Sequence, residues 1–576
     1  MASLFSSLNI GRLGLLAQQY TMNVLGNNIA NVNTEGYTRR RVVLAPTTPT
    51  ELGQFIFGTG VKVEDIQRVR DTFLDVYLRN ELGTFGMLDR SNAAYKQIEV
   101  IFNELTDQGR SLSGMMAEFW SAWQTLSTEP ENPAMRQAVV SNGASLASTF
   151  RYMKDRLDGL RGDLNTTVKT TVDEINDLAA QIQALNSEIV SMENAPHEAH
   201  DLRDRRDVLL DQLSQLVGVT TRDFGDGEMA VFINGNLLVS GNTVRTIDTV
   251  TGSDGLYDVQ WSDTGDDVSL SGGELKGLLD ARDTTIPAYI TRIDALATQL
   301  IKEVNRLHSE GNGLERYTTA TSGVAVDDPD AVLDSAAGLA FEGEIQTGSF
   351  WLAVYDSAGT LLDEQEISVT AGASTLNTLA SEINTDFLAS GYLQASVADG
   401  ELTVELGAGA PTGASFSFVK SDGTGDTSNA LMALGLNTFF TGEDGATIDV
   451  ASAIEANPNL VATASSTAPG DNTIALALAN LRNQMFMIGT EATARTFDEY
   501  YEMTVSTLAI ESAREGSLLT NEENVVNAFK QQREAYSGVN LDEELAQLIG
   551  VEHAYTAAAR YITTIDQMLD TLLSIG

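Results

Sequence analysis

The chain has 576 residues, 43% of them apolar, so it is long enough to form several cores rather than one. Its 80 acidic residues outnumber 35 basic ones and give a net charge of −45 at pH 7, which argues against binding to nucleic acid or to an anionic membrane. The lack of cysteine excludes disulfides, thiolate nucleophiles and cysteine-ligated zinc.

The first residues are expected to form one long helix. From position 4 to position 32 the heptad spacing holds, and seven of the nine positions are apolar. The apolar positions are Leu4, Leu8, Leu15, Met22, Leu25, Ile29 and Val32, and the two exceptions are Gly11 and Gln18. The Asn, Gly and Thr residues that follow predict a turn.

The same N-terminal residues are not typical of a secretory signal. Polar residues such as Asn9 and Arg12 interrupt the apolar positions, and no basic leader precedes them. We therefore expect export, if the protein leaves the cell, by a route without a cleaved signal peptide. No stretch approaches the roughly 18–20 apolar residues that a membrane span needs.

Residues 70–220 are predicted to be mainly helical, with a break at Pro196. A β-rich passage follows, in which Asn234-Gly235 predicts a hairpin turn. Helix is expected again at 273–310. Residues 317–470 differ from the rest, because they carry one lysine against 21 acidic residues and show strand patterns separated by turns. Helix resumes from about 474 to 535.

The C-terminal residues are expected to form a second long helix with the same heptad spacing. Its start is indicated by the Ser537-Gly538 break and by Asn540 as an N-cap, with Glu543 at the capping-box position. The apolar positions are Leu548, Val551, Tyr555, Ala558, Ile562, Ile565, Leu569 and Leu572.

Such a helix at one end of a chain usually covers the protein's own core. Here both ends carry an apolar stripe, so we expect the two arms to pair with each other or with neighbouring copies. The net charges of the N-terminal arm, +3, and of the C-terminal arm, −5, favour this pairing modestly. A tubular assembly with the arms inside and the acidic segment in solvent fits this order of elements.

The predicted fold class is α+β and multidomain, with coiled-coil-like terminal arms, a helical body and inserted β-rich domains. The expected divisions, in chain order, are an N-terminal assembly arm at 1–45, helical body at 46–220, a small β-rich insert at 221–270, helical body at 271–316, an acidic β-rich outer domain at 317–470, helical body at 471–534 and a C-terminal assembly arm at 535–576.

No residue pattern predicts an enzyme, a cofactor or a metal. His197 and His200 lie three residues apart without a third distant ligand, so a solvated helix start is favoured. His553 falls between the stripe positions and is expected at the surface. The run from Asp422 to Asp426 lacks calcium-loop spacing and is interpreted as an acidic turn. Arg39, Arg40 and Arg41 are expected to pair with an acidic neighbour at a contact between subunits.

One N-terminal segment resembles a known family. The string NNIANVNTEGYTR, in which the signature residues are Asn27, Asn28, Asn31, Asn33, Gly36, Tyr37 and Arg39, resembles the signature of flagellar axial proteins, and most closely the hook-associated protein 1 family. The C-terminal 40 residues and the segments LRDRRDVLLDQLSQLVGV and GGELKGLLDARDTTIPAYITRIDALATQLIKEVNRLHSEG resemble the same family.

The resemblance implies a structural subunit at the hook–filament junction of the bacterial flagellum, exported by the flagellar type III apparatus. It implies four partners: other copies of the chain, hook protein, hook-associated protein 3 and an export chaperone on the C-terminal helix. The arms would fold only on assembly. The alternatives are a hook or distal-rod protein, or a secreted adhesin or enzyme with its activity in 317–470.

Overall fold

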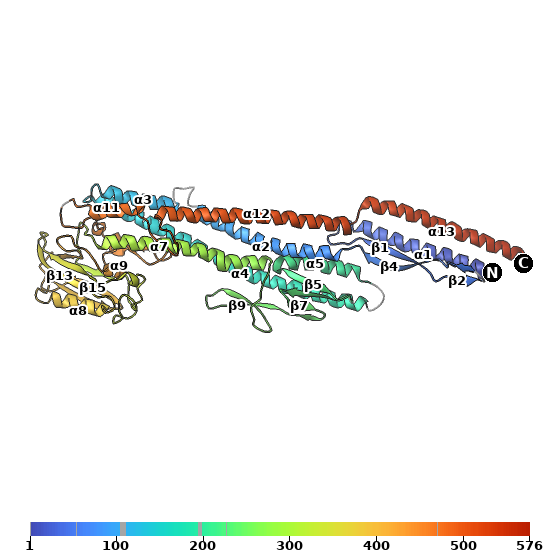
Figure 1. The fold of residues 1–576 in the computed structure, drawn as a ribbon, viewed down its shortest axis with the longest axis horizontal. Coiled ribbons are helices and arrows are strands. Elements are labelled where there is room, and N and C mark those ends of the chain that lie inside the picture. Colours follow the sequence, from blue (N-terminus) through green and yellow to red (C-terminus); the bar gives the residue numbers. More distant parts are fainter. Residues whose placement is uncertain are drawn as a thin grey trace. The chain divides into compact units, whose positions relative to one another are not determined.

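The computed structural model describes residues 2–52, 55–103, 111–193, 198–225, 227–468 and 470–575. The chain folds into two compact units, each built from separate stretches of sequence. Unit 1 comprises Met1–Ala93, Asp163–Ala281 and Arg514–Gly576, and unit 2 comprises Ala94–Gly162 and Arg282–Ala513. Figure 1 shows the elements in chain order by colour.

The helices fall where apolar residues recur at helical spacing. They are α1 (Ala2–Ala30), α2 (Thr72–Asn103), α3 (Leu112–Leu126), α4 (Pro133–Glu193), α5 (His200–Val217), α6 (Glu274–Asp280), α7 (Ile286–Ser309), α8 (Leu376–Asp386), α9 (Ala430–Leu434), α10 (Ser452–Ala456), α11 (Thr473–Asn480), α12 (Phe497–Ser537) and α13 (Leu541–Ile575). Short 3-10 segments and one π-helical turn, Ala281–Thr285, complete them. Within the described residues, no helix has the length and hydropathy that a membrane crossing requires.

Unit 1 contains the strands β1 (Arg40–Pro46), β2 (Thr50–Leu52), β3 (Phe55–Phe57), β4 (Val61–Arg68), β5 (Val219–Asp223), β6 (Met229–Ile233), β7 (Asn236–Ser240), β8 (Thr243–Val244), β9 (Ile247–Thr251) and β10 (Tyr257–Trp261). The order β5-β6-β7-β8 makes an antiparallel sheet, whose β6–β7 turn has positive φ at Asn234 and Gly235, as the sequence predicted. The sheet packs its apolar face on α4 and α5, which forms the core of unit 1.

Glycines let three helices of unit 1 approach closely. A Cβ on Gly86 of α2 would lie 2.2 Å from the carbonyl oxygen of Gln215, and one on Gly277 of α6 would lie 2.4 Å from that of Met87. The backbone amide of Gly273 donates a hydrogen bond to the carbonyl of Gly83 at 2.7 Å. The glycines of the segment GGELKG therefore let the backbone of α6 pack directly against the backbone of α2.

Unit 2 holds the acidic segment and the remaining strands. They are β11 (Thr319–Thr321), β12 (Gly348–Tyr355), β13 (Leu361–Val369), β14 (Leu393–Ala398), β15 (Glu401–Leu406), β16 (Ser415–Ser417), β17 (Phe440–Thr441) and β18 (Asp449–Val450). β12 pairs with β13 and β14 with β15 as antiparallel hairpins, in agreement with the strand patterns and turns expected in 317–470, and Asp399 and Gly400 have positive φ at the second turn. A cluster of aromatic rings around Phe119, Trp123 and Phe439 packs in the core.

Two sequence expectations were wrong in detail. The boundary at 45/46 falls inside β1, and residues 40–52 and 55–68 pair as a long hairpin, β1 with β4 and β2 with β3, where the sequence had predicted the end of an arm and the start of a helical body. Helix α1 ends at Ala30, so Val32 lies in a turn; the Asn31 side chain donates to the Asn27 carbonyl at 3.0 Å and helps to end the helix.

Candidate assembly interface

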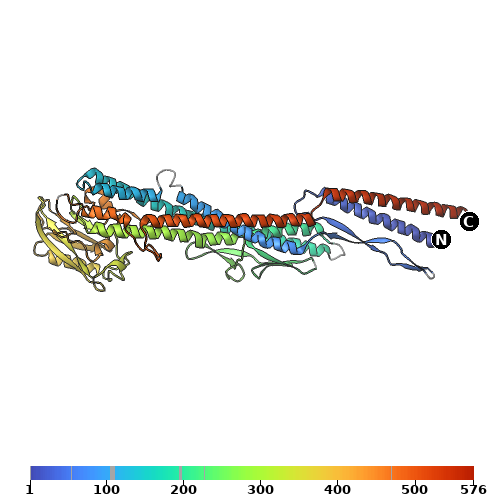
Figure 2. The ribbon, with the colours of Figure 1, turned by 45° about the horizontal axis from the view of Figure 1, so that its top comes forward.

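The two terminal helices lie side by side and antiparallel, as Figures 1 and 2 show from two directions. Asn28 near the end of α1 meets Glu544 near the start of α13, and Gly11 faces Ile562. A Cβ on Gly11 would lie 2.6 Å from a side-chain carbon of Ile562. Gly11 therefore occupies a stripe position because a larger side chain would push the helices apart.

On α13, most of the predicted stripe faces α1. Ile565 is buried, and Leu548, Val551, Ile562 and Leu569 are half-buried. Tyr555 and Leu572 are exposed instead. The residues between the stripe positions, His553 among them, are mostly exposed. The heptad pattern thus locates the contact face, apart from these two positions.

On α1, Leu25 is buried, and Leu8, Leu15, Met22 and Ile29 are half-buried, as is Val32 in the turn beyond the helix. The side chain of Leu4 lies outside the described residues. Ala17 is also buried, although it lies off the predicted stripe. The reason is that α1 has a second packing partner, the β1–β4 hairpin.

Asn28 is the centre of a polar cluster where the two arms meet the rest of unit 1. Its side-chain amide donates to Glu544 and to the backbone carbonyl of Arg40, both at 2.9 Å. Its carbonyl oxygen accepts from the Tyr37 hydroxyl at 2.9 Å and from the Arg40 amide at 3.1 Å. Burial raises the pKa of Tyr37 to about 12, so its hydroxyl stays a donor at neutral pH.

The other signature residues surround this cluster. Asn27, Asn33 and Gly36 are exposed, and Asn31, Tyr37 and Arg39 are half-buried. Gly36 has φ of 76°, a left-handed conformation that favours glycine, and a Cβ there would lie 2.2 Å from the Val208 side chain. The turn 31–38 borders a cavity of about 640 Å³ that α5 and the end of α12 also line.

The C-terminal arm is anchored at the same place. Asn540 caps α13 by accepting from the backbone amides of Asp542 and Glu543 at 3.0 and 3.3 Å, as predicted. The Glu543 carboxylate forms an ion pair with Arg39 at 3.0 Å. The Arg39 amide also donates to the Ser537 carbonyl at 2.8 Å, which ties the signature turn to the end of α12.

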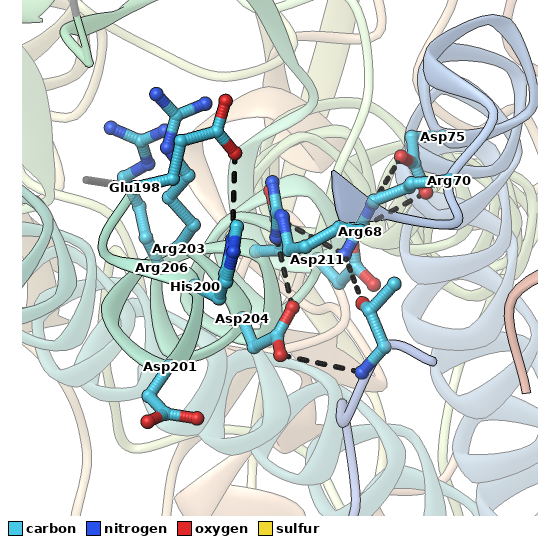
Figure 3. Close-up of polar contacts among 12 residues, drawn as sticks. Arg68, Arg70, Asp75, Glu198, His200, Asp201, Arg203, Asp204, Arg206 and Asp211 are labelled. Carbon is cyan, nitrogen blue, oxygen red and sulfur yellow. Dashed lines mark hydrogen bonds and ion pairs between the residues drawn. The ribbon is translucent and has the colours of Figure 1, made fainter. Parts of the chain in front are cut away.

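Next to Asn28 lies an alternating network of arginines and aspartates, shown in part in Figure 3. Helix α5 presents its aspartates at intervals of three and four residues, so they share one helix face. The aspartates are Asp201, Asp204, Asp207 and Asp211, joined by Asp75 of α2, and the arginines are Arg40, Arg68, Arg70, Arg79 and Arg533.

Asp207 is a buried member of the network and contacts three arginines. Burial alone would raise its pKa, but the guanidinium groups of Arg70, Arg79 and Arg68 hold the pKa well below its usual range. The carboxylate therefore stays charged and paired, with contacts of 2.8 to 3.0 Å to all three. Removing one partner from such a buried pair typically costs about 3–5 kcal/mol, so the network fixes the base of the arms to α2 and α5.

The expected partner of Arg39 and Arg40 was wrong. Both pair within their own chain, Arg39 with Glu543 and Arg40 with Asp201 and Asp204, so they are not free for an acidic neighbour on another subunit. Arg41 lies on β1 with its side chain exposed. The sequence missed the partners because Asp201 and Asp204 are about 160 residues away in the chain.

The remaining candidate residues belong to a helix start and a turn. His200 lies 3.4 Å from Glu198 and begins α5, whereas His197 lies outside the described residues. Asp422 pairs with Lys420 and accepts from the Thr424 amide, which makes the run a turn. Among the described residues, no group of His, Asp and Glu has the arrangement of a metal site.

Comparison with known proteins finds similarity to flagellar proteins in the body and in both arms. The model for the helical domain of flagellar hook-associated protein FlgK matches residues 95–321. The model for flagella basal body rod proteins matches residues 8–38, and the model for the C-terminal region of the FlgEFG rod proteins matches residues 530–575. The two rod models thus cover the arms, and the hook-associated model covers much of the body.

Relatives match along the whole length. Flagellar hook-associated protein 1 of Salmonella typhimurium is 28% identical over 99% of this chain and 100% of its own. Flagellar hook-associated protein 1 of Bacillus subtilis is 28% identical over 100% of this chain and 99% of its own length. The structure of the flagellar hook junction protein FlgK from Burkholderia pseudomallei shares the fold, with a TM-score of 0.50 and 17% identity over 80% of this chain and 100% of its own. With a signature turn, paired arms and a body that match in one order, the chain is similar along its whole length to flagellar hook-associated protein 1, a structural protein of the bacterial flagellum.

Proposed function

We propose that the chain is the structural subunit that joins hook to filament, and that its terminal helices complete their packing only in a tubular assembly of copies. The observation that carries the proposal is the antiparallel pair α1–α13. In this pair, the apolar stripes from the two ends of the sequence contact each other. The family supplies the place in the flagellum, and the helix pair supplies a physical reason for assembly.

The helix pair leaves apolar surface uncovered. Leu545, Ile549, Tyr561, Met568 and Leu573 of α13 are exposed, together with the stripe residues Tyr555 and Leu572. Burying one such side chain is worth about 1.5–3 kcal/mol, whereas an isolated helix is only marginally stable. Contacts with neighbouring copies would cover this surface and stabilise the ordered arms, which supports coupled folding and assembly.

The proposed partners follow from the same surface. In the assembly each copy contacts other copies through its arms, with hook protein below and hook-associated protein 3 above. Before export, a chaperone covers the C-terminal helix, because exposed apolar side chains aggregate. The protein acts outside the cell, after type III export. It is not an enzyme.

A test replaces a buried residue of the arm and an exposed one nearby. Ile565→Asp places a charge in the α1–α13 contact, whereas Gln567→Asp changes an exposed position on the same helix. In a strain that lacks the native protein, we expect the Gln567 variant to restore filaments. The Ile565 variant should leave hooks without filaments and release filament subunits into the medium. Full filaments with Ile565→Asp would reject the proposal.

A further inference from the structure

The hairpin 40–68 ends in an apolar tip. The side chains of Phe55, Ile56 and Phe57 are 63%, 71% and 53% exposed. Successive residues of a strand point to opposite faces, so Phe55 and Phe57 lie on one face and Ile56 on the other. Phe55 and Phe57 therefore make one face of the tip apolar, whereas Ile56 lies on the other face beside its cross-strand partner Glu51. A partner with an apolar surface would cover the face that carries the two phenylalanine rings.

A second apolar surface lies on α2 and α12 at the base of the arms. Phe73 and Tyr77, one turn apart on α2, are 78% and 57% exposed. The ring of Tyr77 stacks on Phe529 of α12 with the centroids 6.3 Å apart. Tyr536, two turns beyond Phe529 on α12, is exposed as well. We call these four residues the aromatic strip.

The tip of one chain lies far from its own strip. The base of the hairpin is at the strip end of unit 1, because the Arg39 amide bonds to Ser537 and the Val69 amide to the Arg39 carbonyl. From Arg40 the strands run along α1, and the tip lies beside the N-terminal end of that helix in Figures 1 and 2. Twelve extended residues span about 40 Å. A copy displaced along the arms by this length brings its tip to the neighbour's strip.

We propose that the tip of one copy docks on the aromatic strip of the next copy. The two surfaces are different, so the contact is head-to-tail and leaves one tip and one strip free at the two ends of any row of copies. Such a contact propagates into a ring or tube, whereas a self-complementary contact stops at a dimer. The inference rests on the proposed self-assembly and names the surfaces that carry it.

The chain contains no cysteine, so single cysteines report the contact directly. The variants are Ile56→Cys at the tip and Tyr77→Cys on the strip, with Asp177→Cys on an exposed face of α4 as the control. Full-length proteins are concentrated and treated with a short bismaleimide. We expect a cross-linked dimer when the Ile56 and Tyr77 variants are mixed. We expect none from either alone or from Ile56→Cys mixed with Asp177→Cys.

A self-linked Ile56 dimer, or no mixed product in samples that scatter light as assemblies, would overturn the docking proposal and leave the proposed function intact. Phe55→Ser combined with Phe57→Ser gives a second measurement, with an unchanged circular dichroism spectrum as the check that the fold is retained. We expect at least a tenfold rise in the concentration needed for assembly. Unchanged assembly of this double variant would also reject docking between copies. So would the absence of cross-linking together with sedimentation of the protein on zwitterionic lipid vesicles that depends on the tip residues.

Discussion

Buried polar residues join distant parts of the chain in both units. Asn28 in unit 1 bonds to Glu544, 516 positions away, and His308 in unit 2 bonds to the backbone of Asn437 and Ala462. The family signature singled out Asn28, but nothing in the sequence pointed to Glu544 or to a role for His308. Such partners depend on tertiary packing, which a local pattern does not contain.

His308 makes the stability of unit 2 sensitive to acid. The ring is fully buried; Nε2 accepts from the Ala462 amide at 2.9 Å, so Nδ1 carries the proton and donates to the Asn437 carbonyl at 2.7 Å. Burial lowers its pKa from 6.5 to about 4. Because the unfolded chain binds the proton first, stability falls as the pH drops from about 6.5 to about 4, by about 3 kcal/mol.

The measurement is denaturant unfolding followed by tryptophan fluorescence, since the Trp123 ring lies 6.5 Å from that of His308. His308→Gln should lose stability at neutral pH but show a shallower decline towards pH 4 than the native chain. His553→Gln, at an exposed position, serves as the control and should retain the native slope. Parallel curves for the native chain and His308→Gln would show that this histidine does not set the acid sensitivity.

At the scale of elements, periodicity predicted the long helices and turn residues predicted the hairpins in 221–270 and 317–470. The hairpin 40–68 was missed because the alternation of apolar and charged residues in its strands is short, and residues 50–57 carry little polar patterning. The alternation of Val42 and Leu44, and of Val61 and Val63, was a usable signal. The positions of these strands along α1 could not be predicted, because they depend on α1 having a second packing face.

Glycines that let helices approach give a prediction at this scale. Gly86→Ala puts a methyl group against the Gln215 carbonyl, so we expect a loss of about 1–3 kcal/mol in the free energy of unfolding. Gly159→Ala, on the open side of α4, has no atom within 4 Å and should gain about 0.4–1 kcal/mol from reduced unfolded-state entropy. Denaturant titrations of both variants test this, and equal stability of Gly86→Ala and the native chain would refute the close approach.

For the whole molecule, the sequence predicted the order of helical and β-rich regions but not their grouping. The small sheet at 219–244 belongs to unit 1 with the arms, and the acidic segment belongs to unit 2 with α3, α7 and α11. Helices α2, α4 and α12 each contribute to both units, so sequence boundaries at helix ends do not mark them. Long helices shared in this way give no change of composition where one unit ends.

The account of the whole molecule depends on the arms being completed by neighbours. Hydrogen exchange followed by mass spectrometry on the full-length chain, as a dilute monomer and as an assembly, measures this directly. Peptides from 5–30 and 541–574 should exchange rapidly in the monomer and become protected by at least a hundredfold in the assembly, while α5 and the sheet on it stay protected in both. Arms already protected to the level of α5 in the dilute monomer would contradict the account.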